Sequence, residues 1–183
     1  MKALIVYYSM SGNTAYAAQK IAERIHAETI RLEPVEAYPD SGFRKFFHGG
    51  KSAVTEEKPE LMPYSFEAGQ YDVIIFGFPV WAGNIAPPVR TFINDSKPEA
   101  ARYAAFACQS GFGAEKAFGK LKDCLGHKLS NTLVLIDPKN KPESAKDIQI
   151  EKFCDDLMRE QNEAGRMWQF LFPQSTHSRG SCG

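Results

Sequence analysis

Cysteine, histidine and excess charge are all scarce in this 183-residue sequence, and each scarcity argues against a class of protein. The four cysteines form no CxxC pair, which argues against a zinc ribbon, an iron–sulfur cluster or a thioredoxin-type redox couple. The four histidines show no ligand spacing. Lys plus Arg and Asp plus Glu both number 22, so the basic surface of a nucleic-acid-binding protein is missing. We therefore expect neither a metal site nor a nucleic-acid partner.

Long apolar runs are also missing from the sequence. No stretch approaches the roughly 20 residues that cross a bilayer, and the run 3–8 is too short for the core of a signal peptide. Hydrophobic residues make up 43% and charged residues 24%, which is close to the average of globular chains. We expect a soluble cytoplasmic protein with one domain at 1–162 and a tail at 163–183.

Short apolar runs alternate with helical patterns along this domain. Runs without internal alternation are typical of strands that are buried on both faces of a parallel sheet. Strands are expected at 3–8, 28–33, 71–77, 102–108 and 133–136. Helices are expected at 14–27, from the proline pair 87–88 through 93, at 114–125 and at 142–161. This order predicts an open α/β fold with helices on both faces of a parallel sheet.

Two segments fall outside the alternation. The insert 34–70 is long for a compact domain, and such loops are often lids or binding loops. Its aromatic residues are candidates for the substrate-side wall of a site, or else three of its phenylalanines form the buried face of a short helix. These residues are Tyr38, Phe43, Phe46, Phe47 and His48. The tail either packs its aromatic residues onto the domain, docks a partner, or is a non-native extension.

The chemistry is expected at the carboxyl ends of the strands, where open parallel sheets bind ligands. The loops after the first, third and fourth strands contain no charged residue and no histidine. They are Ser9, Met10, Ser11, Gly12, Asn13 and Thr14; Pro79, Val80, Trp81, Ala82, Gly83 and Asn84; and Gln109, Ser110, Gly111, Phe112 and Gly113. Such loops lack a nucleophile–base pair, so no catalytic side chain is predicted. They can offer backbone N–H groups, hydroxyls and an aromatic face.

The first of these loops predicts an anion site. It ends at a helix N-terminus, where unpaired N–H groups and the helix dipole attract negative charge, and Gly12 lets the backbone approach a ligand closely. An ordinary Ser/Thr-rich turn with a helix cap is the alternative. Other phosphate motifs fail: Lys45 stands where a P-loop needs glycine, and residues 114–116 break the dinucleotide-binding pattern. Ala114 also stands where a Cys108 phosphatase would need arginine.

Three segments taken together resemble the flavodoxin-like FMN-binding family, particularly its short-chain members with a PVWxG loop. They are YYSMSGNT at 7–14, IIFGFPVWAGNIAPPVRTFI at 74–93 and AFACQSGFGAEKAFGKL at 105–121. The resemblance covers about residues 1–160. It implies a three-layer fold, a five-stranded sheet in the order 2-1-3-4-5, and FMN bound noncovalently at the carboxyl edge.

The resemblance also implies roles for the three loops. By position, residues 9–14 would cradle the FMN phosphate, 79–84 would pass along the ring, and 109–113 would hold its pyrimidine side. Backbone N–H groups in loops without carboxylates can stabilise the negative charge that a flavin gains on reduction. Trp81 would offer a stacking face, or alternatively it packs at the sheet edge.

The neutral charge bears on function. Carrier flavodoxins are typically acidic, which steers them toward basic partners, and this chain is not. The leading hypothesis is an FMN oxidoreductase that moves electrons from NADH, NADPH or a protein donor to a small acceptor such as a quinone or a flavin. The alternative is an electron-transfer protein that serves a redox protein partner. A third hypothesis is a scaffold of this fold that binds no flavin and acts through its tail.

Overall fold

Five parallel strands form a single sheet in the order β2-β1-β3-β4-β5, which confirms the predicted topology. The computed structural model describes residues 1–38, 58–139 and 144–171, without the side chains of 144 and 164–171. The strands are β1 (Ala3–Tyr7), β2 (Glu28–Arg31), β3 (Tyr71–Pro79), β4 (Ala100–Gln109) and β5 (Asn131–Ile136). The interiors of β1, β3 and β4 are buried on both faces, as their unbroken apolar runs predict.

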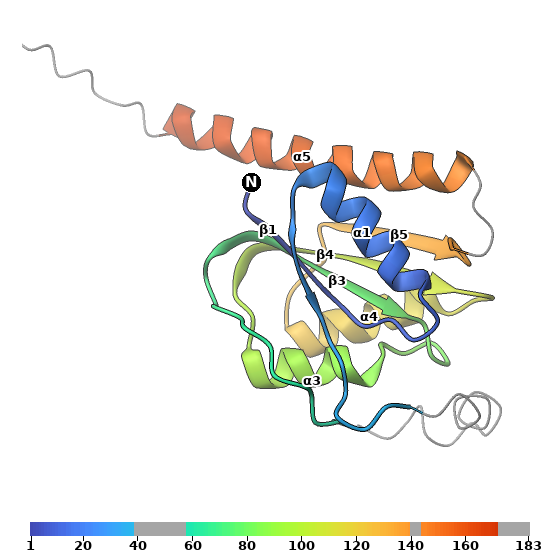
Figure 1. Ribbon diagram of the computed structural model, residues 1–183. Coiled ribbons are helices and arrows are strands. Elements are labelled where there is room, and N and C mark those ends of the chain that lie inside the picture. The colour runs from blue at the N-terminus through green and yellow to red at the C-terminus, as the bar shows by residue number, and fades with distance from the viewer. Residues whose placement is uncertain (39–57, 140–143, 172–183) are drawn as a thin grey trace, which may run out of the picture.

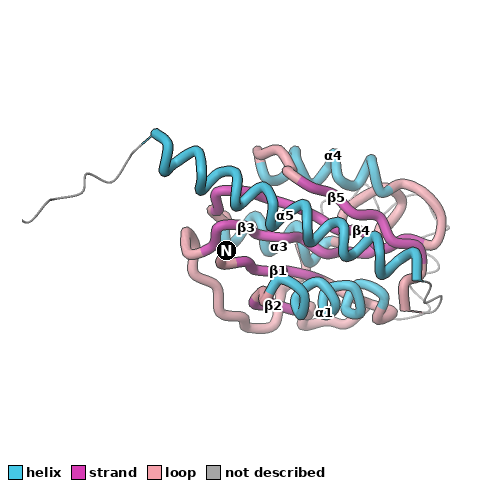
Figure 2. The backbone as a smooth tube through the Cα atoms, turned by 90° about the horizontal axis from the view of Figure 1, so that it is seen from above, coloured by secondary structure: helices cyan, strands magenta, loops and turns pink. Residues whose placement is uncertain are grey.

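Helices cover both faces of this sheet, so the three-layer architecture is also confirmed (Figure 1). They are α1 (Asn13–Ile25), α3 (Pro87–Ser96), α4 (Ala114–Leu125) and α5 (Ser144–Leu171). α1 and α5 pack on one face, and α3 and α4 pack on the other. Figure 2 shows α1 lying beside β1 and β2, while α5 crosses nearer to β4 and β5. None of the described helices combines the length and apolar character of a membrane span.

Two parts of the insert between β2 and β3 lie side by side and are joined by hydrogen bonds. Pro34 and Leu61 form an antiparallel bridge, the Val35 N–H donates to the Glu60 carbonyl (2.9 Å), and the Met62 N–H donates to the Glu33 carbonyl (2.7 Å). These contacts join the two arms of the insert to each other at its base. The predicted short helix with Phe43, Phe46 and Phe47 lies outside the described residues, as does His48.

Helix α5 is longer than the sequence predicted. Its apolar stripe indicated an end near Gln161, but the helix continues to Leu171 and extends past the amino ends of the strands (Figures 1 and 2). The guanidinium of Arg102 on β4 ties this helix to the sheet, because it donates to the Glu160 carboxylate (2.9 Å) and the Gln161 amide oxygen (2.9 Å). The proposed boundary between domain and tail at 162 thus falls inside a continuous helix.

Candidate functional site

The loops that follow β1, β3, β4 and β5 meet at the carboxyl edge of the sheet. Between them lies a cavity of about 200 Å³. It is lined by Met10, Ser11, Asn13, Pro79, Val80, Trp81, Cys108, Gln109, Ser110 and Asp137. Residues from all three loops that the sequence singled out therefore face one space. The cavity lies where the strand order reverses between β1 and β3, which is where open α/β sheets bind ligands.

The first loop presents backbone donors at the start of α1. Gly12 precedes the helix with φ of 91°, a left-handed conformation that favours glycine. The Ser9 hydroxyl oxygen accepts the Ala15 N–H (3.0 Å), which satisfies one of the free N–H groups of the first turn. Within the described part of the chain, the backbone N–H groups of residues 11–14 have no protein acceptor. Four consecutive donors are therefore available to an anion.

The side chains of this loop do not all face the cavity. Thr14 is 1% exposed, and its hydroxyl makes a hydrogen bond with the thiol of Cys108 beneath the loop. Burial raises the pKa of Cys108 to about 12, so this residue is a neutral thiol and no nucleophile near pH 7. The Ser11 hydroxyl is exposed, and it accepts only a long hydrogen bond from the Asn13 amide (3.5 Å). Ser11 is thus the open hydroxyl among those that the sequence predicted.

The second loop is a tight turn with an unusual backbone. The Trp81 N–H donates to the Asn84 carbonyl (3.1 Å), and the Asn84 N–H donates back to the Trp81 carbonyl (2.9 Å). The two residues between them, Ala82 and Gly83, both have positive φ, at 49° and 74°. This is the geometry of a two-residue hairpin turn, which requires left-handed residues at both central positions. The turn fixes the direction of Trp81.

Trp81 packs against two tyrosines while it lines the cavity. Its ring lies edge-on to Tyr8 at the end of β1 (5.8 Å between centroids) and to Tyr38 at the base of the insert (5.2 Å). Burial raises the pKa of Tyr8 to about 12, so its phenol stays protonated. Packing at the sheet edge was the alternative to stacking on a ligand, and this half-buried ring has an environment that suits both.

The third loop lies directly against the second. A Cβ at Gly113, where φ is 110°, would lie 3.1 Å from the Gly83 Cα, so glycine allows the two loops to touch. The Gln109 amide oxygen accepts the Ala114 N–H (3.1 Å) and thereby caps α4. Phe112 is 93% exposed at the rim of the site. A large apolar side chain in this position is available to cover a ligand or a partner.

A fourth loop, which the sequence analysis did not include, brings charge to the site. Asp137 follows β5 with φ of 43°, lines the cavity, and accepts a hydrogen bond from the Ser110 hydroxyl (2.9 Å). Two residues later, the Lys139 N–H donates to the Asn13 side-chain oxygen (2.9 Å). The signal was available, because the fifth strand ends at the same edge as the other strands. The loop after the fifth strand carries charged residues, whereas the prediction rested on the uncharged loops after the first, third and fourth strands.

The arrangement can bind an anion and a flat apolar group side by side. The free N–H groups at α1 suit a phosphate, and Trp81 with the backbone of the second and third loops suits a planar ring. Across the described ranges, no cluster of three or more His, Cys, Asp or Glu side chains could hold a metal ion.

The comparisons with known proteins agree with this geometry. The family described as Flavodoxin matches residues 2–149. A candidate flavoprotein from Bacteroides eggerthii DSM 20697 has a similar structure, with a TM-score of 0.67, 21% identity, and coverage of 84% of this chain and 96% of that one. A flavoprotein in complex with FMN from Lactobacillus acidophilus NCFM gives a TM-score of 0.59 and 24% identity, with coverage of 76% and 95%. At these identities the two structures establish a shared fold.

Proposed function

This chain belongs to the flavodoxin family, and we propose that it is an FMN-dependent oxidoreductase that passes electrons from a nicotinamide or a protein donor to a small acceptor such as a quinone or a flavin. FMN is its cofactor, as family membership and the FMN complex of the Lactobacillus acidophilus flavoprotein both support. When bound, FMN supplies one- or two-electron transfer.

The observation that carries the proposal is the set of free donors at the start of α1. The residues present fit a phosphate, because four adjacent backbone N–H groups lack a protein acceptor and Gly12 has no side chain to cover them. We infer that residues 9–14 hold the FMN phosphate. Ser11 would add its exposed hydroxyl, whereas Ser9 and Thr14 would shape the loop from below through their contacts with Ala15 and Cys108.

The ring would lie along the second and third loops, residues 79–84 and 109–113. Trp81 offers an aromatic surface there, and the contact between Gly83 and Gly113 holds the two loops together. The cavity of about 200 Å³ is smaller than the roughly 300–1,000 Å³ of pockets that enclose a ligand. Part of a bound ring would therefore stay accessible to an electron donor or acceptor.

The chain's own contribution is binding and electrostatics. Cys108 is a neutral buried thiol, and among the described residues that line the cavity Asp137 is the one carboxylate, which is hydrogen-bonded to Ser110. The three predicted loops themselves hold no acid or base. A reaction whose chemistry belongs to the cofactor is consistent with this lining.

Charge favours an enzyme over a carrier. The net charge is zero, and lysine side chains border two of the site loops: Lys139 lies over Gly12 and Lys116 lies over Gly83. Lysines at the rim would attract a phosphate-bearing donor such as NADH or NADPH and would repel the basic protein partners that acidic carriers attract. An electron-transfer protein without its own substrate is the second candidate.

The test is steady-state oxidation of NADH and NADPH by the FMN-loaded protein with a quinone as acceptor. We expect turnover that saturates with one nicotinamide and exceeds the rate of the same concentration of free FMN. The carrier hypothesis would replace the enzyme hypothesis if neither nicotinamide were oxidised while the loaded protein still exchanged electrons with a reduced redox protein. A preparation that does not bind FMN would overturn both.

A further inference from the structure

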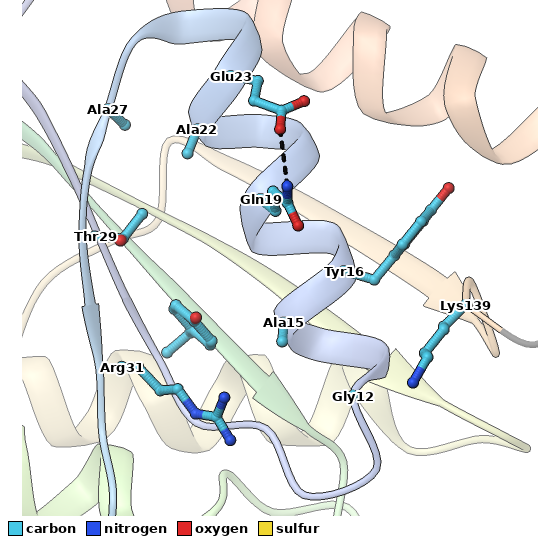
Figure 3. A pocket seen from close by; sticks show the side chains of 11 residues that line it. Gly12, Ala15, Tyr16, Gln19, Ala22, Glu23, Ala27, Thr29, Arg31 and Lys139 are labelled. Carbon is cyan, nitrogen blue, oxygen red and sulfur yellow. Dashed lines mark hydrogen bonds between the residues drawn. The ribbon is translucent and has the colours of Figure 1, made fainter.

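Lys139 lies across the loop that begins α1. A Cβ placed on Gly12 would be 3.0 Å from the Lys139 Nζ and 3.3 Å from its Cδ, so the lysine side chain occupies the space that glycine leaves open. Figure 3 shows the ammonium directed toward Gly12 from the loop after β5. The Lys139 N–H also donates to the Asn13 side-chain oxygen (2.9 Å), which anchors the backbone of the lysine to the same helix end.

No carboxylate of the described residues forms an ion pair with Lys139. Among the described residues it forms no ion pair, whereas other cations of the surrounding surface are paired: Lys20 with Asp147 (3.4 Å) and Arg31 with Glu33 (3.2 Å). Lys139, Arg31 and Gly12 line one shallow groove of about 760 Å³ along α1, and Lys139 is the one that lies against Gly12. An ammonium and four N–H groups that have no partner in the described part of the chain therefore lie beside one another.

We propose that the Lys139 ammonium binds the FMN phosphate, as a charged contact added to the neutral donors of residues 9–14. This inference rests on the proposed function, because it requires FMN at the start of α1. A phosphate dianion gains more from an ammonium than from neutral donors alone, since charge-assisted hydrogen bonds are roughly twice as strong. Lys139 would thus help the protein distinguish FMN from riboflavin, which has no phosphate.

The test compares the affinities of FMN and riboflavin for the flavin-free protein. Lys139→Gln removes the charge but keeps the backbone bond to Asn13, Lys139→Arg keeps the charge, and Lys152→Gln removes an exposed lysine on α5 as the matched control. Binding is measured by flavin fluorescence at low and high salt. We expect Lys139→Gln to weaken FMN roughly tenfold and riboflavin less than about twofold.

The other variants distinguish the effect of the Lys139 charge from a structural role of its side chain. Lys139→Arg should retain most of the FMN affinity, Lys152→Gln should retain all of it, and the salt dependence of FMN binding should be lost with Lys139→Gln alone. Equal loss of FMN and riboflavin would overturn the inference in favour of a structural role, and unchanged FMN affinity would overturn it outright. In both cases the proposed function survives. An unaltered chain that does not bind FMN would overturn both proposals.

Discussion

At the residue scale, the hydroxyl groups of the first loop differ in the groups that they contact. The sequence predicted three hydroxyl donors for a phosphate; in the structure the Ser9 oxygen accepts the Ala15 N–H, which leaves its own O–H free to donate, and the Thr14 hydroxyl pairs with the Cys108 thiol. A one-dimensional pattern identifies polar residues, but the direction of each side chain depends on the loop backbone, including the positive φ of Gly12. The composition of this loop could therefore be predicted, whereas the direction of each hydroxyl could not.

Ser9→Ala should destabilise the flavin-free protein by about 1 kcal/mol, the usual cost of removing a side-chain cap from a helix N-terminus. The loss arises because the Ala15 N–H, 3.0 Å from the Ser9 oxygen, would be left without its acceptor. Urea unfolding measures the change. Ser11→Ala is the control, because its exposed hydroxyl supports only the 3.5 Å contact with Asn13. Equal destabilisation by the two substitutions would refute this assignment.

At the element scale, the strands and helices of the domain could be read from the sequence, whereas the end of the last helix could not. The buried strands have unbroken apolar runs, and Pro87 stands in the first turn of α3 as predicted. The apolar stripe of α5 ends near Met158, but the helix continues because its later residues include good helix formers such as Glu163, Ala164 and Met167. Apolar periodicity reports burial, so it does not detect a helix that leaves the body of the protein.

Ending the chain after Ala164 should leave both flavin affinity and stability unchanged. The described contacts that hold α5 to the sheet, from Arg102 and Asn131 to Glu160 and from Arg102 to Gln161, all precede the cut. Ending it after Arg159 should instead cost about 2 kcal/mol, because the Arg102 guanidinium, in a side chain 17% exposed, would lose its two oxygen acceptors on side chains, those of Glu160 and Gln161. Flavin titration and urea unfolding measure the two properties.

Both truncations should keep flavin affinity, since these contacts lie toward the amino ends of the strands and the site lies at the carboxyl ends. Loss of FMN binding on ending the chain after Ala164 would mean that later residues complete the pocket. Equal stability of the two truncated chains would refute the role of the Arg102 contacts.

At the scale of the whole molecule, the alternation of strands and helices predicted a parallel sheet with helices on both faces, with ligands at its carboxyl edge. The strand order, which the structure confirms, was implied by the resemblance to the flavodoxin-like family. The sequence analysis did not predict which charged residues lie at the site. Asp137 and Lys139 join it through a loop that lies more than a hundred residues from the first loop in sequence. Folding pairs β5 with β4 and brings the loop after β5 to the start of α1. The packing of Tyr38 on Trp81 could not be predicted either, because these two residues also lie far apart in the sequence.

Stability should fall at alkaline pH. Burial raises the pKa of Cys108 from 9.0 to about 12, that of Tyr8 from 10.0 to about 12, and that of Cys154 from 9.0 to about 11. Below pH 9 these groups are protonated in both states, so they add no pH dependence. Above it the unfolded chain releases protons that the folded chain retains, and stability declines until the folded-state pKa values are passed.

The decline should approach about 1.4 kcal/mol per pH unit for each group that has begun to titrate in the unfolded chain. Urea unfolding at a series of pH values measures it, and Cys154→Ala should reduce the slope between pH 9 and 11. A free energy of unfolding that stays constant over this range would contradict the burial of these groups.

The central claim is that the N-terminus of α1 holds the phosphate of FMN, and the most direct measurement follows the backbone amides of Ser11, Gly12, Asn13 and Thr14 by NMR while FMN or riboflavin is added. We predict large downfield shifts of these four amide protons with FMN and much smaller ones with riboflavin, because only FMN brings an acceptor to them. Saturable FMN binding that leaves all four amides unchanged would contradict the account.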